Sequence, residues 1–159
     1  LAFAAWVFGR AQRAGRGAAA GGALVLLALA GSAALLPRLG VATADAVPGA
    51  EAWSEARVAA LRAEGRAVFV NATAAWCITC KVNERVALSS DSLRAAFAAR
   101  GVTYLVADWT RGDAAIGALL RAHGREGVPL YLFYPAGGGA PEVLPQLLTE
   151  GIVLRAIGG

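Results

Sequence analysis

Residues 67–80 of the chain have the sequence AVFVNATAAWCITC, and this stretch decides the fold. Its first part, residues 67–73, is a nearly continuous apolar run, which is typical of a central β-strand covered on both faces. Cys77 and Cys80 follow directly, at the start of a segment with helical spacing that extends over residues 77–88. The sequence therefore predicts a buried strand, a short loop, and a helix that begins with a cysteine pair.

The spacing of the two cysteines indicates thiol chemistry. Cys77 and Cys80 are three residues apart, so both sulfur atoms lie on one face of the helix and within reach of a disulfide. Cys77 lies at the helix N-terminus, where free backbone N–H groups and the helix dipole stabilise a thiolate, the nucleophile of thiol–disulfide exchange. Cys80 lies one turn further along, and we expect it to be less exposed and to resolve the mixed disulfide.

Other roles of the cysteine pair stay open at this point. Two cysteines at this spacing can be half of a zinc site, but zinc takes about four ligands and His123 is the only histidine in the chain. Two thiolates can also bind Cu(I), although the chain contains no methionine. A static disulfide across so short a loop would stabilise the fold little by loop entropy. We expect a redox dithiol that needs no metal and no cofactor.

Helical and strand-like segments alternate through the rest of the C-terminal part. A proline, Pro129, stands directly before one of the expected strands, a position that sheets tolerate. The alternation predicts an α/β fold with a central sheet between helices. The expected helices cover residues 53–64, 77–88, 92–100, 113–123 and 149–157, and the expected strands cover residues 67–73, 102–107, 130–134 and 142–144.

Charge and hydrophobicity divide the chain into two parts. The 159 residues are 57% hydrophobic and only 16% charged, with a formal net charge of +4. This hydrophobicity excludes an intrinsically disordered chain. The excess positive charge lies in residues 1–40, because the other 11 basic side chains are balanced by 11 acidic ones. We expect no binding of nucleic acid, since residues 41–159 carry no net charge. The four N-terminal basic residues are Arg10, Arg13, Arg16 and Arg38.

A long apolar run occupies residues 18–36 (AAAGGALVLLALAGSAALL). As a helix it would be about 28 Å long, close to the bilayer hydrocarbon thickness of about 30 Å. Three arginines precede the run and one follows it, which places its N-terminal side in the cytoplasm by the positive-inside rule. Ala42-Thr43-Ala44 has the shape of a signal-peptidase site, so a cleaved signal peptide is one alternative, and a buried core helix is another. We expect a transmembrane helix at residues 18–37.

Four segments follow from these observations. Residues 1–17 are interpreted as the end of a preceding span and a cytoplasmic loop, and residues 18–37 as the transmembrane helix. Residues 38–50, small side chains around Pro48-Gly49, are interpreted as a linker, and residues 51–159 as the globular domain. The chain has no methionine even at position 1, so we expect it to be part of a longer protein.

Several segments of the globular part, taken together, resemble a known protein family. The stretches are FVNATAAWCITCKVNERVAL, VADWT, GVPLYLFY and LPQLLTEGIVLRAI. They look like the C-terminal periplasmic thioredoxin-like domain of the DsbD protein-disulfide reductase family, in particular its variants related to ScsB. The resemblance covers residues 51–159, and the apolar run before them resembles the last transmembrane helix of that family. It implies a thioredoxin-like fold, a central mixed sheet flanked by helices, preceded by one transmembrane helix.

The resemblance also implies a function and a location. In that family the domain takes two electrons from a cysteine pair of the membrane domain and passes them to periplasmic thiol–disulfide proteins. The same donor and acceptors are implied here, in a bacterial inner membrane with the thioredoxin-like domain in the periplasm. Two alternatives are a singly anchored thioredoxin-like protein for cytochrome c maturation and a Cu(I)-binding thiol module.

Individual site residues can be carried over from the family motifs. The resemblance makes Cys77 and Cys80 the redox pair and Pro129 the cis-proline of the loop that faces it. It places Trp76 beside the pair, where it shapes partner docking, with plain core packing as the alternative.

An acidic residue near the cysteines is also part of the resemblance. Glu84, seven residues after Cys77, would raise the pKa of the Cys77 thiol and carry its proton. A solvated glutamate that pairs with Lys81 or Arg85 is the alternative interpretation. Many family members have a buried aspartate six residues before the first cysteine, but this chain has Asn71, which cannot take up a proton.

Overall fold

The computed structural model describes residues 49–158 of the chain. The predicted transmembrane helix at residues 18–37, the segment 1–17 and nearly all of the linker 38–50 lie outside the described residues. Within residues 49–158, none of the helices combines the length and apolar character needed to cross a bilayer.

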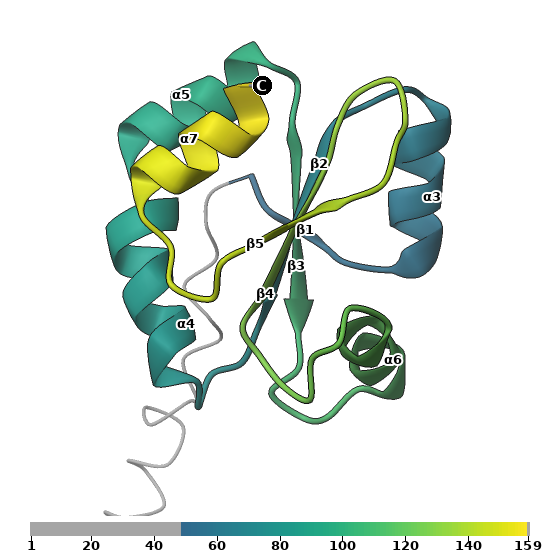
Figure 1. Ribbon diagram of the computed structural model, residues 1–159, viewed down its shortest axis with the longest axis vertical. Helices are drawn as coiled ribbons and strands as arrows, with labels where there is room; N and C mark the ends of the chain where they lie inside the picture. Colours follow the sequence, from purple (N-terminus) through teal and green to yellow (C-terminus); the bar gives the residue numbers. More distant parts are fainter. Residues whose placement is uncertain (1–48, 159) are drawn as a thin grey trace, which may run out of the picture. The chain divides into compact units, whose positions relative to one another are not determined.

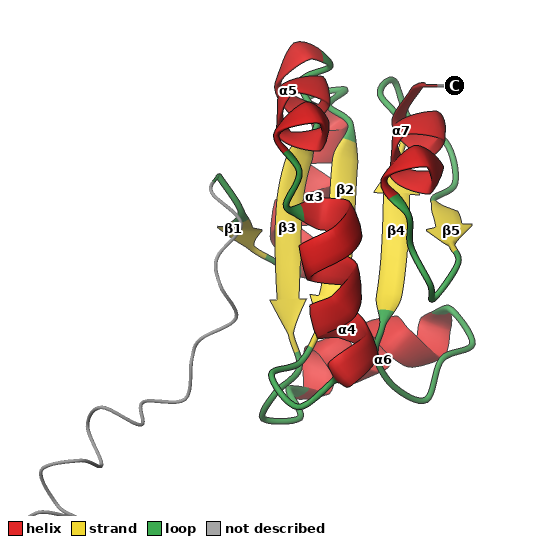
Figure 2. Ribbon diagram, turned by 90° about the vertical axis from the view of Figure 1, so that its left-hand side faces the viewer, coloured by secondary structure: helices red, strands yellow, loops and turns green. Residues whose placement is uncertain are grey.

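A mixed sheet of five strands forms the centre of the described domain, in the order β1-β3-β2-β4-β5 (Figure 2). The central strand β2 runs parallel to β3 and antiparallel to β4, β1 joins β3 in parallel, and β5 joins β4 antiparallel. All residues of β2 and β4 are buried, as expected for strands covered on both faces. The strands are β1 (Glu51–Ala52), β2 (Val68–Thr73), β3 (Thr103–Asp108), β4 (Leu130–Tyr134) and β5 (Glu142–Leu144).

Helices cover both faces of this sheet. Figure 1 shows α4, α5 and α7 on one side of the strands and α3 and α6 on the other. Helix α4 continues directly into a π-helical turn, η2, and this α4–η2 segment follows the carboxyl end of β2. The helical elements are α3 (Glu55–Ala63), α4 (Ile78–Asn83), η2 (Glu84–Leu88), α5 (Asp91–Ala99), α6 (Ala114–Ala122) and α7 (Glu150–Gly158).

Two apolar clusters fill the layers on either side of the sheet. Alternate residues of β2 point to opposite faces, so Phe69 belongs to one cluster while Val68 and Val70 belong to the other. On the α5 and α7 side, the Phe69 ring lies 5.4 Å from Phe97 and 5.7 Å from Tyr104, measured between ring centroids. These contacts fix β2 within the sheet, and β2 in turn positions the cysteine pair that follows it.

The helix ends follow local sequence signals. The side-chain oxygens of Ser54, Ser90 and Asp113 accept backbone N–H groups of the first turns of α3, α5 and α6, which identifies them as N-cap residues. Gly65 ends α3 with a φ of 73°, a left-handed conformation that favours glycine. Apart from the helix expected over residues 77–88, the expected helices begin and end within two residues of the observed ones.

The α/β fold class with a mixed central sheet is confirmed, and two local features differ from the sequence expectations. The edge strand Glu51–Ala52 was not predicted, because two exposed residues carry no alternating pattern and are defined only by pairing with β3. The expected helix over residues 77–88 is α-helical only to Asn83 and then widens into the π-turn η2. Hydrophobic periodicity does not distinguish a single π-turn from continued α-helix.

Candidate redox site

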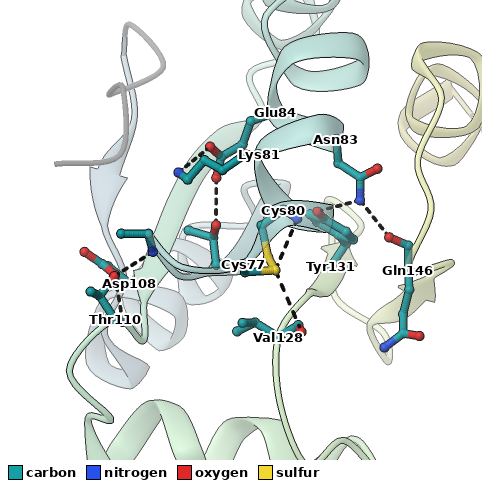
Figure 3. The surroundings of a disulfide bond; sticks show 12 residues. Cys77, Cys80, Lys81, Asn83, Glu84, Asp108, Thr110, Val128, Tyr131 and Gln146 are labelled. Atoms are coloured by element: carbon teal, nitrogen blue, oxygen red, sulfur yellow. Dashed lines mark hydrogen bonds and ion pairs between the residues drawn. A yellow bond between two sulfur atoms is a disulfide. The ribbon is translucent and has the colours of Figure 1, made fainter. Parts of the chain in front are cut away.

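Cys77 and Cys80 form a disulfide in the loop and first turn that follow β2 (Figure 3). Their Cα atoms are 5.3 Å apart. Cys77 is the N-cap residue of α4, and its Sγ accepts the backbone N–H of Cys80 at 3.2 Å. Cys77 retains 7% exposure, whereas Cys80 is fully buried. Of the two sulfur-bearing residues, only Cys77 is therefore open to a partner.

The loop before β4 lies against the cysteine pair. The Val128–Pro129 peptide bond is cis, as the family resemblance implied. The carbonyl oxygen of Val128 lies 4.0 Å from the Sγ of Cys77, a contact rather than a hydrogen bond because the disulfide sulfur carries no hydrogen. Pro129 thus lies next to the residue that contacts the Cys77 sulfur, and its part in partner binding stays a prediction.

Trp76 lies on the surface beside the disulfide. Its side chain is 59% exposed, so it is not a core residue. Its Nε1 donates to the carbonyl oxygen of Thr110 at 3.2 Å, and its ring lies 6.2 Å from that of Trp109 in a tilted arrangement. The ring is therefore held in place and open to solvent, as a docking residue requires.

The loop after β3 supports the loop that carries the cysteines. The Oγ1 of Thr110 accepts the backbone N–H of Ala75 at 2.9 Å, and Asp108 accepts both the N–H and the hydroxyl of Thr110. Thr110 was not among the predicted site residues. Its partner lies 35 residues away in the chain, and no local pattern reports such a contact.

Glu84 lies one turn after Cys80 and is bound from two sides. Its Oε1 accepts the hydroxyl of Thr73 in β2 at 2.7 Å, and its Oε2 lies 2.7 Å from the Nζ of Lys81. The Glu84 side chain is only 15% exposed. The expected pairing with Lys81 is present, but the carboxylate is partly buried rather than solvated, and the contact with Thr73 was not foreseen.

Asn71 lies two residues before Thr73, on the same face of β2. Its Nδ2 donates to the hydroxyl of Tyr104 at 2.8 Å, and its Oδ1 has no hydrogen-bond partner within residues 49–158. Asn71 is buried, with 1% exposure. It occupies the strand position at which the family resemblance expects an acid. In the α4–η2 segment, which carries the disulfide, the acidic residue is Glu84.

A second buried asparagine, Asn83, ties the α4 helix to a distant segment. Its Nδ2 donates to the hydroxyl of Tyr131 at 2.9 Å and to the carbonyl oxygen of Gln146 at 2.6 Å. Its Oδ1 accepts the backbone N–H of Leu148 at 3.1 Å. The residue that follows the cysteine pair by one turn therefore holds the chain between β5 and α7, a role with no signal in the sequence.

Burial of two tyrosines predicts a loss of stability in alkali. Burial raises the pKa of Tyr131 to about 12, against the lowering effect of the hydrogen bond from Asn83, and it also raises the pKa of Tyr104. Because the folded-state pKa exceeds the ordinary value of about 10, this stability is fully present below pH of about 10 and is lost as the pH rises toward about 12. Urea unfolding should show a decrease of about 1 kcal/mol per tyrosine for each pH unit in that window.

The matched variant for this prediction is Tyr131→Phe. It removes one of the buried phenol hydroxyl groups, so its free energy of unfolding should decrease less steeply between pH of about 10 and about 12 than that of the wild type. An equal slope in the two proteins would contradict the assignment to Tyr131.

Apolar side chains are exposed on the helix that carries the cysteines. Ile78, between the two cysteines, is 81% exposed, and Val82 and Val86 are more than half exposed at successive turns.

In the described part of the chain, no group of three or more histidine, cysteine, aspartate or glutamate side chains gathers in a way that could hold a metal ion.

Comparisons with known proteins agree with this fold. A family model described as thioredoxin-like matches residues 49–136. The thiol:disulfide interchange protein DsbD of Ralstonia nicotianae is 37% identical over 86 residues, which are 54% of this chain and 14% of that protein. This chain therefore matches only a small part of the length of that relative.

Solved structures show the same fold at low sequence identity. The oxidised C-terminal domain of DsbD from Neisseria meningitidis has a TM-score of 0.52 and 20% identity, with 66% of this chain and 95% of that chain covered. A thioredoxin from Thermus thermophilus has a TM-score of 0.52 and 21% identity, with 67% and 83% covered. The thioredoxin-like fold expected from the sequence is confirmed.

Proposed function

The chain belongs to the thioredoxin-like family, and from this premise we propose that its described domain is a thiol–disulfide oxidoreductase that reduces disulfides in other proteins. One observation carries the proposal: a disulfide joins an accessible Cys77 at the start of a helix to a fully buried Cys80 one turn further on. This asymmetry gives the two sulfur atoms the separate roles of attacking and resolving thiol.

The reaction begins with the reduced pair. The Cys77 thiolate, stabilised by the N–H of Cys80 and the start of α4, attacks one sulfur of the partner disulfide. A mixed disulfide forms, and the other partner sulfur leaves as a thiolate that takes a proton from solvent. The Cys80 thiolate then attacks the Sγ of Cys77, which restores the Cys77–Cys80 disulfide and releases the second partner thiolate. Two electrons pass from the cysteine pair to the partner disulfide.

Glu84 is proposed as the acid–base group of the site. Its carboxylate takes up a thiol proton during turnover, as the family resemblance implied. The partly buried position of the carboxylate, one helical turn after Cys80, supports this role. Asn71 cannot substitute for it, because an amide does not exchange a proton with a thiol in this pH range.

Exposed apolar residues around Cys77 support a protein as the substrate. Trp76 and Ile78 flank the attacking cysteine and are largely exposed, while the Val128–Pro129 loop contacts its sulfur. A partner polypeptide that covers these side chains would bury apolar surface and bring its disulfide to Cys77. Trp76 and Pro129 are therefore proposed as docking residues rather than as chemical participants.

The electron relay and the membrane anchor are further parts of the proposal. The predicted transmembrane helix at residues 18–37 would hold the domain outside the cytoplasm, in the periplasm of a bacterium. Its donor would be a membrane cysteine pair of the same protein, and its acceptors would be periplasmic thiol–disulfide proteins. Support comes from the similarity to a DsbD protein and from the resemblance to its ScsB-related variants.

The proposed function is tested with the Cys80→Ala variant of the whole chain. Without Cys80 the mixed disulfide cannot be resolved, so a protein substrate with a reducible disulfide, such as insulin, should accumulate as a covalent adduct through Cys77. Non-reducing electrophoresis and mass spectrometry of the adduct identify the linkage. The wild type should give no lasting adduct and should equilibrate with glutathione redox buffers as a two-electron couple.

Two results would overturn the proposed function. One is a Cys80→Ala chain that captures neither insulin nor a small disulfide. The other is a wild-type pair that stays oxidised in dithiothreitol under conditions where the fold is intact by circular dichroism.

A further inference from the structure

The Glu84 carboxylate is bound by groups on its buried and its exposed side. The Lys81 ammonium lies 2.7 Å from Oε2 (Figure 3). The Thr73 hydroxyl, on the central strand, donates to Oε1 at 2.7 Å. Thr73 is fully buried, whereas the Lys81 side chain is 35% exposed. One oxygen is therefore attached to the sheet beneath the helix, and the other is attached to a side chain that reaches solvent.

The buried cysteine needs a proton acceptor within the protein. Cys80 is fully buried, and its thiol must lose a proton before it can attack the mixed disulfide. Glu84 follows Cys80 by four residues along the helical segment, a spacing that places the two Cβ atoms about 6 Å apart. The other buried polar side chains on this face, Asn71, Thr73 and Asn83, do not titrate in the range where thiols ionise.

The groups that face Glu84 come from four elements: Thr73 of β2, Lys81 of α4, Tyr104 of β3 and Tyr131 of β4. Burial raises the pKa of both phenols, and the nearby Glu84 charge adds to this effect. Both tyrosines stay neutral through the pH range of thiol exchange. The Lys81 ammonium draws the carboxylate toward solvent, and Thr73 is the group that donates to it from the buried side.

We propose that Thr73 is a positioning residue for the resolving step: its hydroxyl holds the Glu84 carboxylate on the sheet side of the helix, where it accepts the proton of Cys80. In that step the Cys80 S–H bond breaks and Glu84 becomes protonated. The Cys80 sulfur then bonds to the Cys77 sulfur, the bond between Cys77 and the partner breaks, and the partner leaves as a thiolate with the electron pair. Glu84 returns its proton to solvent on the Lys81 side. The inference rests on the proposed function and assigns a residue to one of its steps.

Dithionitrobenzoate, an aromatic disulfide that releases a coloured thiolate, separates the two steps. The reduced whole chain, kept in a mild detergent, should release a first thiolate at a rate that depends on reagent concentration, as Cys77 attacks. A second thiolate follows at a rate independent of reagent concentration, as Cys80 resolves the mixed disulfide. The second phase therefore reports the step in which Glu84 acts.

Thr73→Val, which removes the hydroxyl and keeps the shape, should slow the second phase about tenfold at neutral pH. The rate of the second phase in this variant should keep increasing with pH, because hydroxide replaces the displaced carboxylate as the proton acceptor. The wild-type rate should instead reach a plateau. The first phase should change by less than about twofold, and Thr73→Ser, which keeps the hydroxyl, should restore the wild-type profile.

A matched control and a double variant complete the test. Thr103→Val alters another buried strand threonine, whose hydroxyl has no hydrogen-bond partner within the described domain, and should leave both phases unchanged. Thr73→Val combined with Glu84→Gln should be no slower than Glu84→Gln alone, because both changes remove one function.

The inference is overturned if Thr73→Val keeps the wild-type pH profile of the second phase while Glu84→Gln changes it, or if the two effects multiply. A wild-type chain that shows no second phase would instead overturn the proposed function itself, since Cys80 would then resolve nothing.

Discussion

We expect the Cys77→Ser chain to release thiolate from dithionitrobenzoate at least about a thousandfold more slowly than the wild type. A serine hydroxyl does not ionise at neutral pH and does not break a disulfide. The remaining thiol, Cys80, is fully buried in the first turn of α4 and cannot reach the reagent. The fold should be unaffected, because the Oγ of serine is itself a good N-cap group for α4.

The comparison with Cys80→Ser makes this result specific. That variant keeps the accessible thiol, so it should release one equivalent of thiolate promptly, where the wild type releases two and Cys77→Ser releases none. Thr79→Ser, between the two cysteines, serves as the control and should behave as the wild type. Fast release of one equivalent by Cys77→Ser would show that Cys80 is accessible and that the roles of the two residues are reversed.

The positions of the two cysteines could be predicted because they depend on local sequence. A continuous apolar run specifies the buried strand β2, and a spacing of three residues at the next helix start specifies both sulfur positions. Helix starts are local in the same way, since the serine and aspartate N-cap residues lie next to the first turns that they cap. Features of this kind lie within a window of a few residues, and the structure agrees with them.

The supporting contacts of the site could not be predicted, because their partners are distant in sequence. Glu84 illustrates the division: its contact with Lys81 has helical spacing and was foreseen, whereas its contact with Thr73 depends on how α4 packs over β2. The support of Ala75 by Thr110 spans 35 residues, and the two backbone contacts of Asn83 span 63 and 65 residues. Such pairings follow from strand order and helix placement, which periodicity alone does not give.

The exposure of the Trp76 side chain could not be predicted from local sequence alone. Trp76 could be interpreted equally as a docking residue or as a core residue, because a tryptophan is suited to both. Its position is decided by the β3 loop, where Thr110 accepts the indole N–H and leaves most of the ring in solvent. The sequence predicted that this residue belongs to the site, and the tertiary contact determines how it is presented.

Asn83→Leu, a change that nearly preserves side-chain volume, should lower the free energy of unfolding by about 3 kcal/mol. The variant leaves the carbonyl of Gln146, the N–H of Leu148 and the hydroxyl of Tyr131 without their partner. The N–H of Leu148 is buried and can be solvated only if the chain between β5 and α7 moves away from α4. The Tyr131 hydroxyl is buried, so water cannot replace the hydrogen bond that it loses.

Two measurements distinguish this mechanism from a general loss of packing. Hydrogen exchange at Leu148 should become faster than the change in global stability requires, because the local anchor is lost. The pKa of Tyr131 should rise further, since the hydrogen bond from Asn83 is what lowers it against burial. Ser89→Ala, which removes a surface hydrogen bond to Arg85 just after η2, is the control and should cost less than about 1 kcal/mol. An Asn83→Leu protein with wild-type stability and an unchanged Tyr131 titration would show that α4 is held to this segment by apolar contacts alone, with the buried amide contributing nothing.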